Sequence, residues 1–113
     1  MVNEVMKNPR IIDYDFRPIR SEVETPYGKI DLVGEDSNGN IVIVEFKRST
    51  AQLQAVSQLK RYVDYYKSIS KNVRGILVAP NITSSARKLL LEYGLEYRKL
   101  TPKLSTPSLD NLF

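Results

Sequence analysis

The sequence contains neither cysteine nor histidine, and both absences narrow what the protein can do. Without cysteine the chain forms no disulfide and offers no thiolate to a metal. Without histidine it lacks a common zinc ligand and the most frequent acid–base catalyst. Any bound metal must therefore be held by oxygen ligands, which favours Mg²⁺ or Mn²⁺ over Zn²⁺.

Long apolar runs are also missing. The N-terminal residues MVNEVMKNPR have no apolar core of the kind that a signal peptide needs, and no run approaches the length of a membrane span. We therefore expect an intracellular, cytoplasmic protein with no membrane partner.

The 113 residues suffice for one domain with one hydrophobic core. Their charge is divided unevenly, since residues 1–45 carry five basic and nine acidic side chains and residues 46–113 carry twelve basic and four acidic ones. This division fits an acidic pocket beside a basic surface that binds a polyanion. A solvated, lysine-rich surface explains the same numbers equally well.

The period of the apolar residues changes along the chain and predicts eight elements. Helices are expected within residues 2–12, where the Asn8-Pro9 pair closes the helix, and over residues 51–70 and 84–93. Strands are expected over residues 17–25, 29–36, 40–48, 73–80 and 95–100. This order predicts an α/β fold whose sheet combines an antiparallel hairpin with a parallel crossover.

Caps and breakers set the limits of these elements. Ser49 or Thr50 is expected to cap the second helix, and Thr83 the third, which ends at Gly94. The last residues, TPKLSTPSLDNLF, contain two prolines and several small polar residues. We therefore expect a single domain over residues 1–100 and a flexible tail over residues 101–113.

The stretch GKIDLVGEDSNGNIVIVEFK carries the most informative pattern. Its NGN turn joins two alternating runs, as in a β-hairpin, and this pairing places Asp31 near Glu45 at the end far from the turn. Glu45 and Lys47 are two residues apart and share one face of their strand. Charged groups at the end of an apolar strand are usually paired or bound to a metal.

Two carboxylates and a main-chain carbonyl, here that of Phe46, can hold a hard divalent cation. Lys47 beside them can orient a water or help to deprotonate it, and the metal can lower the pKa of that water. This combination is what phosphodiester hydrolysis needs. A structural ion pair between Glu45 and Lys47 on an exposed strand is the alternative.

These residues match a known pattern. Asp31, thirteen intervening residues and then Glu45-Phe46-Lys47 resemble the motif of the PD-(D/E)XK nuclease superfamily, with Ile30 at the position of the proline. The segments TPYGKIDLVGED, IVIVEFKRSTA and AVSQLKRYVDYY resemble the nuclease domain of the archaeal NucS (EndoMS) endonuclease family, over roughly residues 8–100. The resemblance implies a restriction-endonuclease-like core, a central mixed β-sheet flanked by α-helices.

The resemblance also implies roles for individual residues. Asp31 and Glu45 would be metal ligands, together with the carbonyl of Phe46, and Lys47 would be the catalytic lysine. The cofactor would be Mg²⁺ or Mn²⁺. Full-length members carry an N-terminal DNA-binding domain that these residues lack, so we expect a minimal stand-alone relative or a partner that supplies DNA recognition.

Gln58 and Tyr62 match the QxxxY motif of the RecB-like branch and, four residues apart, share one helix face. Tyr62 also fits the buried stripe of its helix, so a role in the core is the alternative. Three basic residues nearby would contact DNA phosphates or be plain solvated surface, namely Arg48, Lys60 and Arg61.

The end of the chain is similar to a second known motif. The sequence TPSLDNLF resembles the sliding-clamp-binding box Q-x-x-L-x-x-F-F, with Thr106 in place of glutamine. Leu109, Leu112 and Phe113 would insert into a hydrophobic pocket of the clamp. A tail that folds back onto its own domain is the alternative.

Together these patterns predict a metal-dependent DNA endonuclease of repair or recombination, acting on mismatched, branched or single-stranded DNA. One alternative is a Holliday-junction resolvase-like nuclease, which would act as a homodimer on branched DNA. The other is a non-catalytic nucleic-acid-binding module of the same fold.

Overall fold

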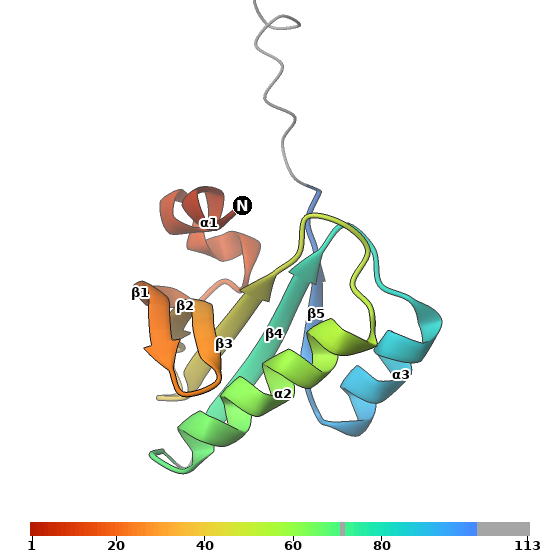
Figure 1. Ribbon diagram of the computed structural model, residues 1–113. Helices are drawn as coiled ribbons and strands as arrows, with labels where there is room; N and C mark the ends of the chain where they lie inside the picture. The colour runs from red at the N-terminus through yellow and green to blue at the C-terminus, as the bar shows by residue number, and fades with distance from the viewer. Residues whose placement is uncertain (71, 102–113) are drawn as a thin grey trace, which may run out of the picture.

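The computed structural model describes residues 1–70 and 72–101, and within them five strands form one mixed sheet in the order β1-β2-β3-β4-β5 (Figure 1). The strands are β1 (Arg17–Thr25), β2 (Gly28–Glu35), β3 (Ile41–Phe46), β4 (Val73–Ala79) and β5 (Glu96–Lys99). The first three are antiparallel neighbours, whereas β3, β4 and β5 are parallel. The predicted α/β fold with an antiparallel hairpin and a parallel crossover is confirmed.

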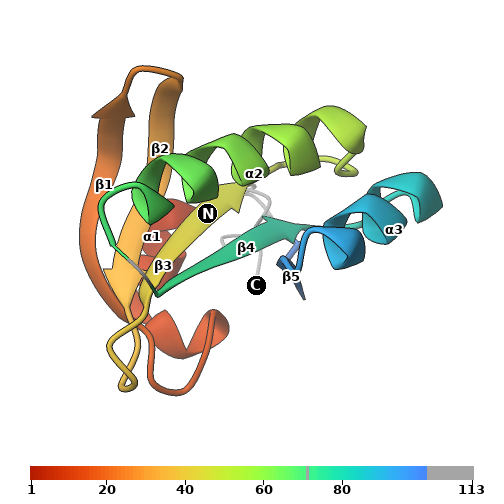
Figure 2. The same ribbon diagram turned by 90° about the horizontal axis from the view of Figure 1, so that it is seen from below.

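Helices cover both faces of the sheet (Figures 1 and 2). They are α1 (Val2–Lys7), the 3-10 helix η1 (Pro9–Ile11), α2 (Leu53–Lys67) and α3 (Ser84–Glu92). One buried cluster joins α2 and α3 to the sheet, and a second joins α1 and the residues after η1 to its other face. In β3, Val42 and Val44 belong to the second cluster and Ile43 to the first, so this strand is apolar on both sides.

One predicted boundary is confirmed and another is wrong. The first helix stops at Lys7, as the Asn8-Pro9 pair predicts, because the residue before a proline avoids the α region, and Asn8 has φ −137° and ψ 79°. The second helix begins at Leu53 with Gln52 as its N-cap, not Ser49 or Thr50. Ala51 instead forms a bridge with Ile82, and Gln52 after it is still extended, with φ −118° and ψ −179°.

Other predictions about the helices have mixed outcomes. Thr83 caps α3 as expected, since its Oγ1 accepts a hydrogen bond from the N–H of Ala86 at 3.2 Å. The apolar spacing within residues 51–70 places Leu53 in one stripe with Val56 and Leu59, yet the side chain of Leu53 is 46% exposed, while the other two are fully buried. Within the described residues, every helix is too short or too polar to traverse a lipid bilayer.

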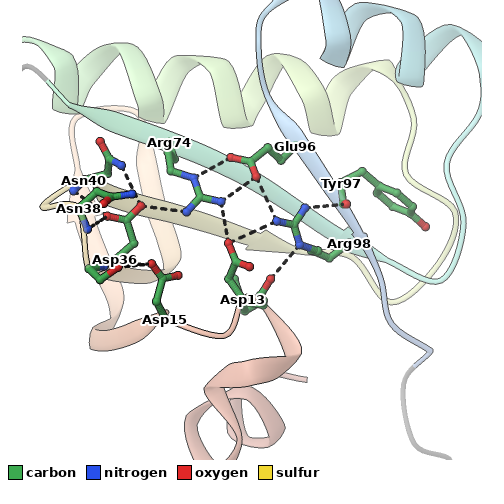
Figure 3. A network of polar contacts seen from close by, with 11 residues as sticks. Asp13, Asp15, Asp36, Asn38, Asn40, Arg74, Glu96, Tyr97 and Arg98 are labelled. Atoms are coloured by element: carbon green, nitrogen blue, oxygen red, sulfur yellow. Dashed lines mark hydrogen bonds and ion pairs between the residues drawn. The ribbon is translucent and has the colours of Figure 1, made fainter.

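A network of ion pairs on the α1 side of the sheet fastens the N-terminal residues to β4 (Figure 3). Arg74 donates two hydrogen bonds to Glu96, at 2.7 and 2.8 Å, and one each to Asp36 and Asp13, both at 3.0 Å. Arg98 donates to the carbonyl of Ile12 at 2.8 Å. Residues far apart in the sequence are thus joined by charge-assisted hydrogen bonds in a poorly solvated place.

Asp36 is the most buried acid of this network, with 2% of its side chain exposed. Burial alone would raise its pKa, but hydrogen bonds from Asn40, Arg74 and the N–H of Asn38 lower the pKa of Asp36 from 3.8 to about 2. An acid whose pKa is lower in the folded state stabilises the protein above its unfolded pKa. That contribution is lost as the pH falls from about 4 to 2.

We therefore predict that Asp36→Asn lowers the free energy of unfolding by about 2 kcal/mol at pH 7, and that the difference from the wild type falls to about a third of this value by pH 2.5. Urea unfolding at pH 7, 4 and 2.5 measures both values. Asp64→Asn serves as the control, because the Asp64–Lys60 pair is exposed to solvent and contributes little. A difference that stays constant over this pH range would contradict the lowered pKa.

Candidate active site

The strands β2 and β3 separate at the end of the hairpin that lies far from its turn. The last residues of their ladder are Leu32 and Val44. Beyond them, the N–H of Asp31 donates to Oε1 of Glu45 at 2.9 Å, and the N–H of Phe46 donates to Oδ2 of Asp31 at 2.8 Å. The two carboxylates thus replace strand-to-strand bonds, and the structure brings Asp31 and Glu45 together as the predicted hairpin requires.

A distortion of β1 accompanies this separation. Glu22 has φ 52°, in the left-handed region that residues other than glycine rarely adopt, and its place in the register is opposite Asp31. Residues two apart normally share a strand face, yet Ile30 packs in the α2-side cluster and Leu32 in the α1-side cluster. The strand β2 therefore twists at Asp31, so that Ile30 and Leu32 face opposite sides of the sheet. No residue in the sequence of β2 predicts this twist.

Glu45 is the buried member of the pair and is 6% exposed. Burial and the nearby charge of Asp31 raise the pKa of Glu45, while the N–H of Asp31 and the ammonium of Lys47 act in the opposite direction. Two carboxylates this close concentrate negative charge in a poorly solvated place. The site therefore favours a cation or a proton between them.

The donors fit a hard divalent cation. In the described hydrogen bonds each carboxylate uses one oxygen, so Oδ1 of Asp31 and Oε2 of Glu45 are left to face a ligand. No group of three acidic, histidine or cysteine side chains gathers within the described residues. Two carboxylates completed by a main-chain carbonyl, for which Phe46 is the predicted donor, therefore match this site better than an all-side-chain cage.

Lys47 follows β3 directly. Its N–H donates to the carbonyl of Val78 at 2.8 Å, which extends the pairing of β3 with β4 by one residue. Its side chain lines the same cleft as Glu45, on the side of the sheet that α2 covers. The predicted placement of Glu45 and Lys47 on one face is therefore what the structure shows.

The helix α2 connects the site to the turn between β1 and β2. The hydroxyl of Tyr62 donates to the carbonyl of Lys29 at 3.0 Å, and Nε2 of Gln58 donates to the carbonyl of Tyr27 at 3.3 Å. Both bonds fix the start of β2, just before Asp31. Tyr62 is 3% exposed and belongs to the core, yet it also lines the cleft, so both sequence interpretations of this residue describe its position.

A cleft of about 590 Å³ opens between α2 and the C-terminal end of β3. The predicted residues Glu45, Lys47, Gln58, Arg61 and Tyr62 all line it. Two further polar residues of α2 do so without having been predicted, Gln54 and Ser57. Their helical spacing from Gln58 and Arg61 is the signal that could have found them.

The other basic residues of the prediction lie elsewhere. Arg48 is exposed next to Lys47. Lys60 forms an ion pair with Asp64 of the same helix, with its Nζ 2.6 Å from the carboxylate. The same Nζ lies 5.4 Å from the ring centroid of Tyr93, at the end of α3. The predicted clamp-binding residues Leu109, Leu112 and Phe113 lie outside the described part of the chain.

Gly28 leaves room for Tyr62. A Cβ at this position would lie 2.7 Å from the hydroxyl oxygen of Tyr62, and φ is +127°. We predict that Gly28→Ala lowers the free energy of unfolding by about 1–2 kcal/mol more than Gly39→Ala. Gly39 also has a positive φ, +82°, but has open space around it, so the control carries the backbone cost alone.

Tyr62→Phe removes the atom that the new methyl group would meet. Gly28→Ala should therefore cost less in the Tyr62→Phe background than in the wild type, a coupling that urea unfolding of the four proteins measures. Equal costs in both backgrounds would show that the hydroxyl does not pack against Gly28.

Comparison with known proteins agrees with this geometry. Residues 1–111 match the family described as Endonuclease NucS C-terminal domain. Endonuclease NucS of Sulfolobus acidocaldarius is 52% identical over 103 residues, and that of Pyrococcus abyssi is 53% identical over 103 residues. These alignments cover 91% and 90% of this chain but 41% of each relative, so the chain spans about two fifths of their length.

Solved structures show the same relationship. A repair endonuclease from Pyrococcus abyssi superposes with a TM-score of 0.88 at 52% identity, over 91% of this chain and 46% of that one. The EndoMS–dsDNA2 complex has a TM-score of 0.88 at 45% identity, over 92% and 44% of the two chains. The predicted resemblance is confirmed, and the chain belongs to the endonuclease NucS family, in which it corresponds to the C-terminal domain.

Proposed function

We propose that the chain is the catalytic domain of a metal-dependent endonuclease that hydrolyses phosphodiester bonds in DNA. The pairing of Asp31 with Glu45 at the open end of the hairpin, with Lys47 in the same cleft, carries this proposal. Two relatives support DNA as the substrate, since one is described as a repair endonuclease and the other is an EndoMS–dsDNA2 complex.

The residues of the cleft divide the chemistry between them. Asp31, Glu45 and the carbonyl of Phe46 would hold Mg²⁺ or Mn²⁺, which supplies an activated water and positive charge against the phosphate. Lys47 orients the attacking water and offsets the negative charge that develops on the phosphate. The cleft is open to solvent on the side of α2, where a DNA backbone can approach.

Contacts to the DNA phosphates need basic side chains whose charge is not already neutralised by an acidic side chain. Arg61 is exposed and lines the cleft, and Arg48 is exposed beside Lys47. Lys60 is already neutralised by Asp64. We therefore assign the DNA backbone to Arg61 and Arg48, because neither forms an ion pair within the described residues and a guanidinium group suits phosphate oxygens.

We assign this activity to DNA repair or recombination, on mismatched, branched or single-stranded DNA. A homodimer and a contact between the C-terminal tail and a sliding clamp stay predictions from the sequence.

A cleavage panel tests the proposal. With Mg²⁺ or Mn²⁺ we expect the wild type to cut at least one substrate among mismatched duplexes, four-way junctions, flaps and single strands. Asp31→Ala and Lys47→Ala should each lower the rate at least about a hundredfold with little change in DNA affinity. Glu24→Ala, on the neighbouring strand β1 and 77% exposed in its side chain, should retain the rate.

The substrates that are cleaved distinguish between the alternative functions. Preferential cutting of four-way junctions would favour a Holliday-junction resolvase. DNA binding by the wild type without cleavage of any substrate would contradict the proposal and favour a non-catalytic module. Undiminished cleavage by Asp31→Ala would remove the assignment of this residue.

Metal binding has a readout that does not depend on activity. At pH 8 in EDTA, we expect Glu45→Gln to melt a few degrees above the wild type, because it removes one of two like charges held together with little solvent. Addition of 10 mM Mg²⁺ should raise the melting temperature of the wild type and leave that of Glu45→Gln unchanged.

Glu35→Gln, on the same strand as Asp31 but half-exposed, is the matched control and should respond to Mg²⁺ as the wild type does. An equal rise in all three proteins would mean that the cation binds elsewhere.

A further inference from the structure

The strands β1 and β2 both turn over at the same point of their ladder. Val23 is paired with Ile30, and both pack against the cluster on the α2 side of the sheet. Ser21 is paired with Leu32, which packs in the cluster on the α1 side. Paired residues of antiparallel strands share a face, so both strands change faces over two residues, where a regular strand would keep them. Each strand has one residue between the two pairs, and the change of face occurs there.

Asp31 is the residue of β2 at this point, and its carboxylate lies between two strands. Oδ2 of Asp31 accepts the N–H of Phe46 at 2.8 Å. The next N–H of the chain, that of Lys47, donates to the carbonyl of Val78 on β4, so the N–H of Phe46 is directed the opposite way, toward β2. The N–H groups of a strand lie in the plane of the sheet, so this carboxylate lies near that plane. A regular β2 would instead project Asp31 from the face that α2 covers, because Leu32 packs on the α1 side.

Glu22 is the residue of β1 at this point, and its backbone is left-handed. Its φ is 52°, and among residues 1–70 and 72–101 it is the only residue other than glycine with a positive φ. Glutamate does not favour this region, because its Cβ crowds the neighbouring carbonyl oxygen. The side chain of Glu22 is exposed and forms no ion pair within the described residues. The surrounding sheet, and not the side chain, therefore holds this conformation.

We propose that Glu22 is a positioning residue whose left-handed backbone turns β1 over and so allows β2 to place the carboxylate of Asp31 between β2 and β3, beside Glu45. The affinity of the site for a divalent cation then depends on a residue that does not line the cleft. This inference rests on the proposed function for its cation. It extends that function by assigning the geometry of the site to a residue on the neighbouring strand.

Hydrogen exchange in EDTA tests the position of Asp31 without a metal. Valine is β-branched and strongly disfavours a positive φ, so Glu22→Val should draw β1 toward a regular strand. We expect the N–H of Phe46, which loses its acceptor, to exchange at least about tenfold faster than in the wild type. The N–H of Lys47 donates to β4 and should keep its rate, which separates a local change from a general loss of stability. Glu24→Val, on the same strand and also exposed, should change neither rate.

Affinity for Mg²⁺ is the second readout. The rise of the melting temperature with the concentration of MgCl₂ gives the dissociation constant. We expect Glu22→Val to bind Mg²⁺ at least about tenfold more weakly than the wild type and to need correspondingly more Mg²⁺ for half-maximal cleavage. Glu24→Val should bind Mg²⁺ as the wild type does.

Glycine separates the backbone of Glu22 from its carboxylate, because glycine adopts a positive φ freely. Glu22→Gly should therefore keep the exchange rate of Phe46 and the affinity for Mg²⁺. A tenfold loss of affinity in Glu22→Gly would assign the effect to the carboxylate and overturn the inference.

The stability of the glycine variants decides the case even if Glu22→Val does not fold. Glycine weakens a regular strand, so Glu24→Gly should melt a few degrees below the wild type in EDTA. Glu22→Gly should melt at or above the temperature of the wild type, because relief of the left-handed conformation offsets the greater freedom of the unfolded chain. Equal losses in the two glycine variants would overturn the inference.

The remaining outcomes distinguish this inference from the nuclease proposal. A folded Glu22→Val with unchanged exchange at Phe46, or with unchanged affinity for Mg²⁺, would overturn the inference while the nuclease proposal stands. Faster exchange at Phe46 in Glu22→Val, when the wild type neither binds Mg²⁺ nor cleaves any DNA, would leave the positioning of Asp31 in place and remove the nuclease assignment.

Discussion

Two hydrogen bonds from the main chain to carboxylates hold open the end of the β2–β3 hairpin, and the site depends on them. Where a regular sheet would pair Asp31 with Glu45 through the backbone, each acid instead accepts the N–H that the separation has left without a strand partner. In these two hydrogen bonds each carboxylate uses one oxygen. The acids are therefore structural acceptors and candidate ligands at once, and truncation of either one leaves a main-chain N–H without its acceptor.

The sequence predicts the elements that depend on local patterns. The alternation of apolar and polar residues and the NGN turn predict the register of the hairpin. Helical spacing predicts α2, and the capping residue Thr83 predicts the start of α3. It could not predict features that arise from contacts across the fold. The positive φ of Glu22 occurs without a glycine that would predict it, the cap at Gln52 follows from the bridge of Ala51 with Ile82, and the contact of Tyr27 with Tyr65 arises only because α2 packs beside the β1–β2 turn.

The uneven charge of the chain also has two different explanations in the structure. Part of the acidic excess of the N-terminal half goes into the network around Arg74, where Asp13 and Asp36 bind basic residues of β4 and β5 on the α1 side. Glu45 lines the cleft under α2, on the other side of the sheet, and Asp31 lies beside it. Summed charge along the sequence could not separate acids that stabilise the fold from acids that are left to bind a ligand.

The distortion of strand β1 affects whether two molecules can associate by pairing their edge strands. As the edge of the sheet next to β2, a flat strand of nine residues would be a template onto which another chain could add. Its pairing with β2 instead shifts register between Pro18 and Arg20, and its backbone turns at Glu22, while charged side chains project along it. The irregularity that accompanies the separation of β2 and β3 at the candidate site thus also makes this edge of the sheet a poor template for strand pairing.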